Sequence, residues 1–534
     1  MQLDIVFGGD QGQGIDKVAS MAGDLFSDMG YYIFKYRDYG SLIKGGHSFD
    51  VLSVSDEPIA SHSYALDGIL ALDDKTVEKH KDRLKDDGFI INAKEIGTES
   101  EYGISFNMLL LGAVAKTMGV SKDKLQKVIE RTFEGKEEVV DKNIQAADEA
   151  YSHAEKVRDI EDREDKIEVM SGSQGIAEGA VRSGIDVYLA YPMTPATPVL
   201  HLLAGRQRED DIAVLQPENE LSVVNAGLGA AHTGAKTMVG SSGGGYDLMQ
   251  EAMSMQGISE IPLVVYLSQR AGAGSGIPTY TAQGDLEIAV HGSHGEAPRV
   301  VIAPGDAVES VEATNQAFYF AENFRALSIL LGDKHVAESD FSMDEDMDIV
   351  DVGRNIDQSE RGGEYRNYKV TEDGNSPRSV PGLNVTKSTS YEHDEYGITI
   401  EDEETINAMT DKRKRKGEKI RERAKEFTQH KVHGDEDSDT VVVGWGSTKG
   451  AIKDAISGMG IKFLQIIYLE PFPEEVTDIL EDAERTVLVE NNSTGLLGDL
   501  ITENTGHVID KKILKYDGRP FHRDKLREKI KKVI

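Results

Sequence analysis

Short apolar runs alternate with amphipathic stretches along most of this chain. An apolar run over residues 3–7 predicts a strand, and apolar positions recur at helical spacing between residues 15 and 26. Strands that alternate with helices in this way predict an α/β fold whose sheets are mostly parallel. Further apolar runs of strand length follow at residues 31–34, 51–54, 68–72 and 88–91.

Two interruptions of this alternation divide the chain into three α/β units. Residues 1–155 form the first unit. The chain from residue 134 to residue 166 is charged with little apolar repeat and is predicted to be solvated, with residues 156–166 as the linker between units. Residues 167–335 form the second unit, whose apolar runs are continuous, as expected for strands buried on both faces. Residues 336–437 are acidic and weakly periodic and end in a charged helix, and residues 438–534 form the third unit.

Length and composition restrict the function. At about 100–200 residues per domain, 534 residues predict several domains. The net charge of −35 argues against a general nucleic-acid binder, because phosphates require a basic surface. The basic run 412–416 is therefore interpreted as a solvated helix face that pairs with acidic neighbours. The absence of cysteine excludes disulfides, a thiol nucleophile and cysteine-ligated iron–sulfur clusters within this chain.

The sequence predicts a cytoplasmic protein. It shows no basic leader followed by an apolar segment, and no window approaches the roughly 18 apolar residues of a membrane span. Two interpretations of the acidity stay open, a surface suited to a salt-loaded cytosol and an ordinary acidic protein.

Two glycine-rich loops of the first unit are ambiguous. The loop 9–14 lies between a strand and a helix, where backbone N–H groups can approach an anion, but a tight structural turn fits equally well. In the segment 44–47, Lys44 stands beside two glycines. It could grip a carboxylate or phosphate, or it could be an ordinary solvated lysine.

Three polar segments follow strands of the second unit. Thr194 lies in a turn stiffened by two prolines, at a strand end where open α/β sheets bind ligands. Ser241 and Ser242 begin a glycine-rich loop that offers hydroxyls and free N–H groups to an anion or cofactor. Arg270 follows the longest apolar strand, and its fork suits a substrate carboxylate. A structural turn remains the alternative for Thr194.

Two further segments carry carboxylate or histidine side chains that could bind a ligand or a metal ion. Glu218 and Glu220 precede a helix rich in small residues, and a carboxylate there is often only a cap. His291, His294 and Glu296 match no common helical zinc spacing, so no metal site is predicted in this chain.

Several motifs occur in a fixed order along the chain. They are residues 12–16, 30–39, 44–47, 191–195, 269–272, 292–296, 371–378, 392–395 and 516–521. In this order they resemble the alpha subunit of 2-oxoacid:ferredoxin oxidoreductases, in the form whose gamma domain is fused at the N-terminus. The resemblance covers nearly the whole chain.

The resemblance implies a domain for each unit. Residues 1–155 would be the gamma domain, and residues 167–335 the pyrimidine-binding domain, called alpha domain I. Residues 336–437 would be an irregular acidic connector with a charged helix. Residues 438–534 would be a transketolase C-terminal-like domain, called alpha domain II. Two of the three α/β domains would thus be of the thiamine-diphosphate-enzyme type.

The resemblance also implies a reaction. A 2-oxoacid, CoA and oxidised ferredoxin would give acyl-CoA, carbon dioxide and reduced ferredoxin, and thiamine diphosphate would supply a nucleophilic carbon and then an electron sink. The diphosphate, Mg²⁺ and a [4Fe-4S] cluster are expected on a separate beta subunit, in a heterodimer or dimer of heterodimers. The substrate favoured is 2-oxoglutarate, followed by pyruvate and then by branched 2-oxoacids.

The resemblance assigns roles to six residues. Glu220 would hydrogen-bond the aminopyrimidine of thiamine diphosphate, with Glu218 as a nearby competitor. Ser241 and Ser242 would lie close to the same cofactor. Three residues would contact the substrate: Thr194 would orient its carboxylate or keto oxygen, Arg270 would form its salt bridge, and Lys44 would lie near the substrate and CoA.

Two other functions are alternatives to this one. An NAD(P)-linked oxidoreductase built on the loop 9–14 would need an acidic ribose-binding residue after the second strand, and residues 34–37 supply none. A non-catalytic assembly or regulatory paralogue is the alternative from another class. The presence of Thr194, Glu220 and Arg270 together argues against it.

Overall fold

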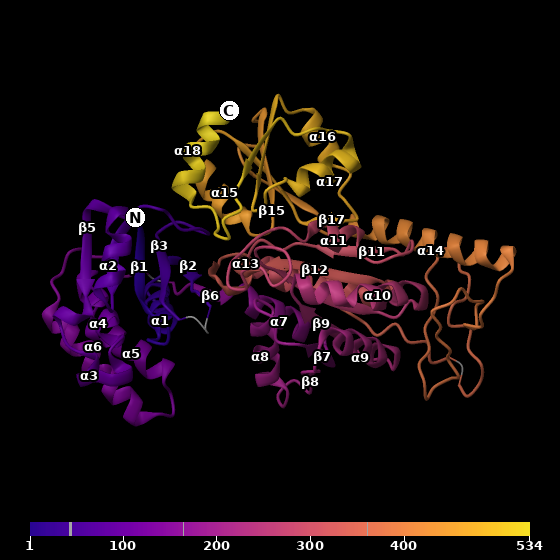
Figure 1. Cartoon of the computed structure of the whole chain (residues 1–534), viewed down its shortest axis with the longest axis horizontal. Coiled ribbons are helices and arrows are strands. Elements are labelled where there is room, and N and C mark those ends of the chain that lie inside the picture. Colours follow the sequence, from indigo (N-terminus) through magenta and orange to yellow (C-terminus); the bar gives the residue numbers. More distant parts are fainter. Residues whose placement is uncertain (42–44, 164, 360) are drawn as a thin grey trace.

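Three α/β units make up the chain. The computed structural model describes residues 1–41, 45–163, 165–359 and 361–534. Figure 1 shows the first unit in indigo and violet at one end, the second in the middle and the yellow C-terminal unit above it. The predicted α/β class is confirmed.

The sheet of the first unit is mixed, not mostly parallel as predicted. Its order is β5-β4-β1-β3-β2-β13-β6, and β2–β3, β1–β3, β13–β2 and β13–β6 are antiparallel. Only residues 39–46 connect β2 to β3, which is too short for a parallel crossover. The elements are β1 Gln2–Asp10, α1 Ile15–Ser27, β2 Tyr32–Asp38, β3 His47–Ser55, β4 Leu66–Ala71, α2 Asp74–His80, β5 Leu84–Asn92, α3 Glu99–Tyr102, α4 Met108–Thr117, α5 Lys122–Thr132 and α6 Glu137–His153.

The segment before residue 166 packs against the first unit instead of being a free linker. The helix α6 buries Ala146, Ala147 and Ala150, and Gly112 of α4 lies directly on the backbone of Ala147. Beyond α6, the backbone N–H groups of Val157 and Ile160 donate to carbonyls at the end of α4. The packing of α6 against α4 uses alanine and glycine, so the sequence contained no stripe of large apolar residues from which it could be predicted.

The second unit is built on a sheet of order β17-β11-β12-β10-β9-β7-β8, parallel except for β17. Alternate strand residues enter two cores, one under α9 and α10 and the other under α7, α8 and α12. Both faces are therefore covered, as the continuous apolar runs predicted. The elements are β6 Glu168–Ser171, α7 Gly172–Arg182, β7 Val187–Ala190, α8 Thr197–Arg206, β8 Ala213–Leu215, α9 Glu220–His232, β9 Thr237–Ser241, α10 Gly243–Ser259, β10 Leu263–Gln269, α11 Leu286–His291, β11 Arg299–Ile302, α12 Ala307–Phe324, β12 Leu327–Asp333, α13 Lys334–Glu338 and β13 Asp340–Met343.

The connector ends in the long helix α14, Glu403–Ala424, whose basic run is partly buried. Lys412 and Lys416 both form ion pairs with the buried Glu260, which follows α10. Although burial opposes it, the two lysines hold the pKa of Glu260 well below its usual range. The predicted solvated face is wrong for these two lysines, because their partner lies inside the protein; the predicted pairing with an acidic neighbour is confirmed.

The third unit docks on the second. Its sheet has the order β14-β16-β15-β18-β19, and Trp445 and Leu464 join the core under α10. Among the described residues, no helix combines the length and the apolar character needed to cross a membrane. The elements are β14 His430–Gly434, β15 Thr440–Trp445, α15 Thr448–Ile456, β16 Lys462–Ile466, β17 Tyr468–Glu470, α16 Val476–Glu481, β18 Arg485–Glu490, α17 Leu496–Thr505, β19 Lys511–Leu514 and α18 Arg523–Val533.

Candidate functional site

Polar residues follow the carboxyl ends of four neighbouring parallel strands of the second sheet. Because these ends meet at one edge of an open α/β sheet, their side chains converge where such sheets bind ligands. Thr194 follows β7, Glu220 follows β8, Ser241 and Ser242 end and follow β9, and Arg270 follows β10.

Glu220 is the carboxylate that the fold turns into this edge. The Asn219 side chain caps α9 by accepting from the Ser222 N–H at 3.0 Å, which makes Glu220 the first residue of the helix. Glu220 is 5% exposed, and its Oε1 accepts from the Ser241 hydroxyl at 3.5 Å. Glu218 is exposed and accepts from the Ser222 hydroxyl at 2.5 Å. Of the two carboxylates, Glu220 is the one that lies buried at the converging strand ends.

Arg270 joins the turn after β7 to the end of β10. Its Nη1 donates to the backbone carbonyl oxygen of Thr194 at 3.1 Å, and its buried Nε has no partner among the described residues. Burial lowers the pKa of Arg270, and the charges of Asp285 and Glu220 oppose that shift. The guanidinium is therefore fixed in place with part of its fork still free to bind a ligand.

The start of α10 forms a close-packed cradle. The Ser242 hydroxyl is buried without a hydrogen-bond partner among the described residues, although this residue occupies the N-cap position. Gly245, in the first turn, lies so close to Ser241 and Glu220 that an added Cβ would overlap both side chains.

Gly245→Ala is expected to lower kcat/KM by at least about tenfold, because the new methyl group must displace the Ser241 hydroxyl or the Glu220 carboxylate. Steady-state kinetics of the assembled enzyme measure this. Gly205→Ala on α8 is the matched control, since its Cβ would meet no atom within 4 Å. Equal activity of the two variants would contradict the packing described here.

A cavity of about 580 Å³ opens at this edge between the second and third units. Arg270 lies in its wall, and α10 contributes Gly243, Gly244 and Asp247. Several lining residues were not identified from the sequence, because they come together only through tertiary structure. They are Asp247, Asp285, Glu287, Asn491, Asn492, Ser493 and Tyr516. Two signals were available in the sequence: residues 491–493 directly follow the strand β18, and Tyr516 belongs to the motif 516–521.

Asp285 is the most unusual of these residues. Its Oδ2 is buried and has no hydrogen-bond partner in the described part of the chain, while its N–H donates to Gln269 Oε1 at 2.9 Å. Burial, with the charge of Asp247, raises the pKa of Asp285 to about 6, and Arg270 opposes the rise. Burying a carboxylate beside Arg270, the proposed anion-binding residue, costs free energy. Such arrangements are found at functional sites.

Asp285→Asn is expected to stabilise the chain at pH 8 by up to about 3 kcal/mol. The folded carboxyl binds its proton more tightly than an unfolded one of pKa 3.8, so the free energy of unfolding falls as pH rises between about 4 and 6. Asparagine removes this loss. Denaturant unfolding at pH 5 and pH 8 measures the effect, and Asp411→Asn at an exposed position of α14 is the control. A gain no larger at pH 8 than at pH 5 would refute this explanation.

Two residues considered from the sequence, Lys44 and His291, are not among the residues described at this sheet edge. Lys44 lies outside the described residues. His291 is 3.3 Å from Glu503 and does not line the 580 Å³ cavity.

Two family models match the chain. The model described as pyruvate flavodoxin/ferredoxin oxidoreductase, thiamine-diphosphate-binding, matches residues 178–412. The model described as pyruvate ferredoxin/flavodoxin oxidoreductase matches residues 4–153. The first match contains every described residue of the converging set.

Known proteins resemble the chain over its whole length. The alpha subunit of 2-oxoacid:ferredoxin oxidoreductase 2 from Aeropyrum pernix is 31% identical over 100% of this chain and 98% of the relative. The 2-oxoglutarate synthase subunit KorA from Methanocaldococcus jannaschii is 29% identical over 61% of this chain and 89% of the relative. The structure of 2-oxoglutarate:ferredoxin oxidoreductase from Magnetococcus marinus, with 2-oxoglutarate, coenzyme A and succinyl-CoA bound, matches with a TM-score of 0.90. Its sequence identity is 25%, and the match covers 99% of both chains.

Proposed function

Because the chain belongs to the alpha subunits of the 2-oxoacid:ferredoxin oxidoreductase family, we propose that it oxidatively decarboxylates 2-oxoglutarate to succinyl-CoA in a complex with a beta subunit. Thiamine diphosphate and CoA are the expected cofactor and co-substrate. The observation that carries this proposal is the meeting of Glu220, Thr194 and Arg270 at one sheet edge. The non-catalytic alternative does not account for a buried carboxylate beside a buried guanidinium.

The residues around Glu220 fit an aminopyrimidine ring. Glu220 is buried with one long hydrogen bond, and the Ser242 hydroxyl is buried without a hydrogen-bond partner among the described residues, so both side chains retain hydrogen-bonding capacity for a ligand. Glu220 would hold the ring and exchange a proton at its Oε atoms. When bound, thiamine diphosphate supplies a nucleophilic carbon and an electron sink.

The charge of the cavity supports a diphosphate site on another subunit. Among its described lining residues, Arg270 is the one cation, whereas Asp247, Asp285 and Glu287 are acidic. A diphosphate here would be repelled unless a partner supplied a metal ion or cations. The absence of cysteine supports the same division for the iron–sulfur cluster that passes electrons to ferredoxin.

Exposed apolar side chains on the elements of the site support a partner surface. They lie next to site residues along the chain, and a soluble monomer gains nothing from exposing them. Burial under a beta subunit would enclose the reacting centre and exclude water. They are Tyr191, Leu221, Leu248, Ile277 and Tyr516, which are between 37% and 73% exposed.

The substrate would be held through its oxygen atoms. Arg270 would bind the 1-carboxylate with the free part of its fork, and the Thr194 hydroxyl would orient the carboxylate or the keto oxygen. Lys44 would lie near the substrate and CoA, as its motif implies.

A second arginine supports a dicarboxylic substrate. Gly518 packs beside Ala271, so the turn that carries Arg519 touches the loop that carries Arg270. Arg519 lies over the Tyr280 ring at 4.4 Å and 3.5 Å from Asp38. It would reach the distal carboxylate of 2-oxoglutarate, which pyruvate lacks. This fits the 2-oxoglutarate bound to the Magnetococcus marinus enzyme.

Reduction of a low-potential dye by the chain co-purified with its beta subunit tests the proposal. We expect activity that requires CoA and thiamine diphosphate, with kcat/KM for 2-oxoglutarate at least about tenfold above that for pyruvate. Arg519→Ala should lower the ratio of kcat/KM for 2-oxoglutarate to kcat/KM for pyruvate by about tenfold. A pyruvate preference would overturn the substrate assignment, and no 2-oxoacid activity in a cluster-loaded complex would overturn the reaction.

A further inference from the structure

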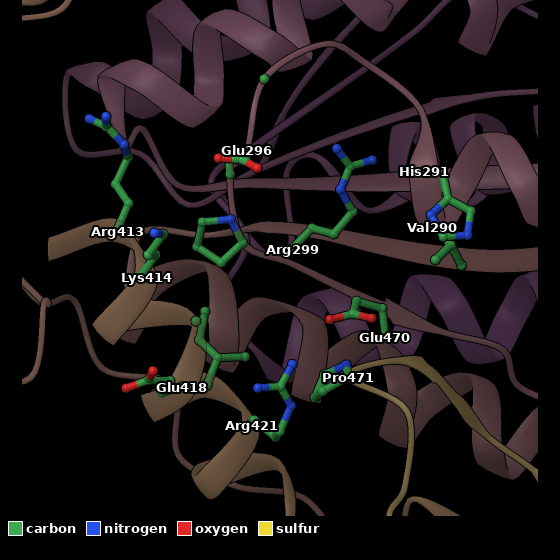
Figure 2. Close-up of a pocket in the computed structure, with 15 residues that line it drawn as sticks. Val290, His291, Glu296, Arg299, Arg413, Lys414, Glu418, Arg421, Glu470 and Pro471 are labelled. Atoms are coloured by element: carbon green, nitrogen blue, oxygen red, sulfur yellow. The ribbon is translucent and has the colours of Figure 1, made fainter. Parts of the chain in front are cut away.

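A second cavity, of about 540 Å³, lies between the helix α14, the segment 290–299 and residues 470–471. We name it the α14 pocket. Figure 2 shows Lys414, Glu418 and Arg421 along one side of it and Arg299, Glu470 and Pro471 on the other. Its volume is in the range of sites that enclose small organic ligands.

The α14 pocket is separate from the 580 Å³ cavity beside Arg270. The helix α11 lies between them: Glu287 and Ile288 line the 580 Å³ cavity, whereas Val290 and His291 line the α14 pocket. No described residue is shared by the two linings, so a ligand of the α14 pocket has its own contacts.

Two of the four cations that line the α14 pocket are unpaired among the described residues, whereas Arg413 pairs with Glu392 and Arg299 is hydrogen-bonded. Lys414 and Arg421, two turns apart on one face, make no hydrogen bond or ion pair within the described part of the chain. Their neighbours are paired, Lys419 with Glu422 at 2.8 Å and Lys425 with Glu474 at 2.6 Å. In a chain of net charge −35, two cations left free beside a cavity indicate an anionic ligand.

The opposite wall provides an apolar surface and hydrogen-bonding groups. Pro298 and Pro471 on this wall, together with Ile420 of α14, offer apolar surface that a ring can cover. Glu470 is half-buried, and its carboxylate has no ion-pair partner among the described residues. Beside it, Arg299 donates to the Ser293 hydroxyl at 2.9 Å and to the Ala289 carbonyl at 3.3 Å. Burial raises the pKa of Glu470, and Arg421 and Arg299 oppose the rise.

We propose that the α14 pocket binds a nucleoside mono- or diphosphate. The base lies on the apolar wall with an amino group toward Glu470, and the phosphate contacts Lys414 and Arg421. Inorganic phosphate alone uses only the cationic side. Glu296 and Glu418, which also line the pocket, disfavour a more highly charged polyanion.

Calorimetric titration of ADP into the complex of this chain with its beta subunit tests the inference. We expect saturable binding that Arg421→Glu weakens at least tenfold, while Lys419→Glu, on the same helix but outside the pocket, leaves it unchanged. Adenosine and inorganic phosphate should each bind at least tenfold more weakly than ADP. Higher salt should weaken ADP binding.

Three results would overturn the inference: no saturable binding of ADP, equal binding by wild type and Arg421→Glu, or displacement of ADP by saturating CoA. The last would mean that ADP occupies the CoA site instead. Dye reduction with 2-oxoglutarate should be unchanged in Arg421→Glu without nucleotide, so this test and that of the reaction are independent.

Discussion

Replacing Arg270 by alanine is expected to lower kcat/KM for 2-oxoglutarate by roughly 30- to 1000-fold, which corresponds to about 2–4 kcal/mol. In the proposed complex the guanidinium would form a charge pair with the substrate carboxylate, at a largely buried position where water would not replace it. Its hydrogen bond to the Thr194 carbonyl is also lost, so the turn after β7 loses its tie to β10. Steady-state kinetics with the dye as acceptor measure the loss.

Two further variants separate binding from folding. Arg270→Lys keeps the charge but not the fork, so its activity should lie between those of wild type and Arg270→Ala. Arg208→Ala removes an exposed arginine of the same unit and should change kcat/KM less than twofold. Wild-type kinetics in Arg270→Ala would show that the substrate carboxylate is held elsewhere.

Glu220→Gln is expected to lower kcat by roughly 10²- to 10⁴-fold, the range for loss of a positioned acid–base group. Glutamine keeps the size of the side chain and its contact with Ser241, but it cannot carry the charge or exchange the proton. The interface with the beta subunit and the iron–sulfur cluster content of the complex should not change, because the substitution is nearly isosteric. Single-turnover kinetics of the loaded complex give this number.

Glu218→Gln is the matched control, since it changes the same functional group two residues earlier at an exposed position. Its rate should stay within twofold of wild type. If Glu218→Gln lost activity and Glu220→Gln kept it, the acid–base role would have to be reassigned to Glu218.

Much of the site could be predicted because strand ends can be recognised locally. A buried apolar run followed by Thr194 or Arg270 marks a side chain at the ligand-binding edge, whatever the rest of the fold. The choice between Glu218 and Glu220 needed the structure, since it depends on the Asn219 cap. That Asp285 and Tyr516 line one cavity could not be predicted, because they belong to units far apart in the sequence.

For the fold as well, local features could be predicted from the sequence and long-range contacts could not. Continuous apolar runs predicted the doubly covered parallel strands of the second unit. Long-range pairing was not predictable: β13 inserts between β2 and β6 and so joins the first sheet to the second unit. The ion pairs of Glu260 with Lys412 and Lys416 are equally non-local, and the basic run alone gave no sign of them.

Release of labelled CO₂ from [1-¹⁴C]2-oxoglutarate reports cleavage of the bond that Glu220 and Arg270 are proposed to help break. We expect CO₂ release by the complex with thiamine diphosphate and CoA, in step with dye reduction, and its near loss in Glu220→Gln. CO₂ release at the wild-type rate by a Glu220→Gln complex with intact cluster and bound cofactor would contradict this proposal.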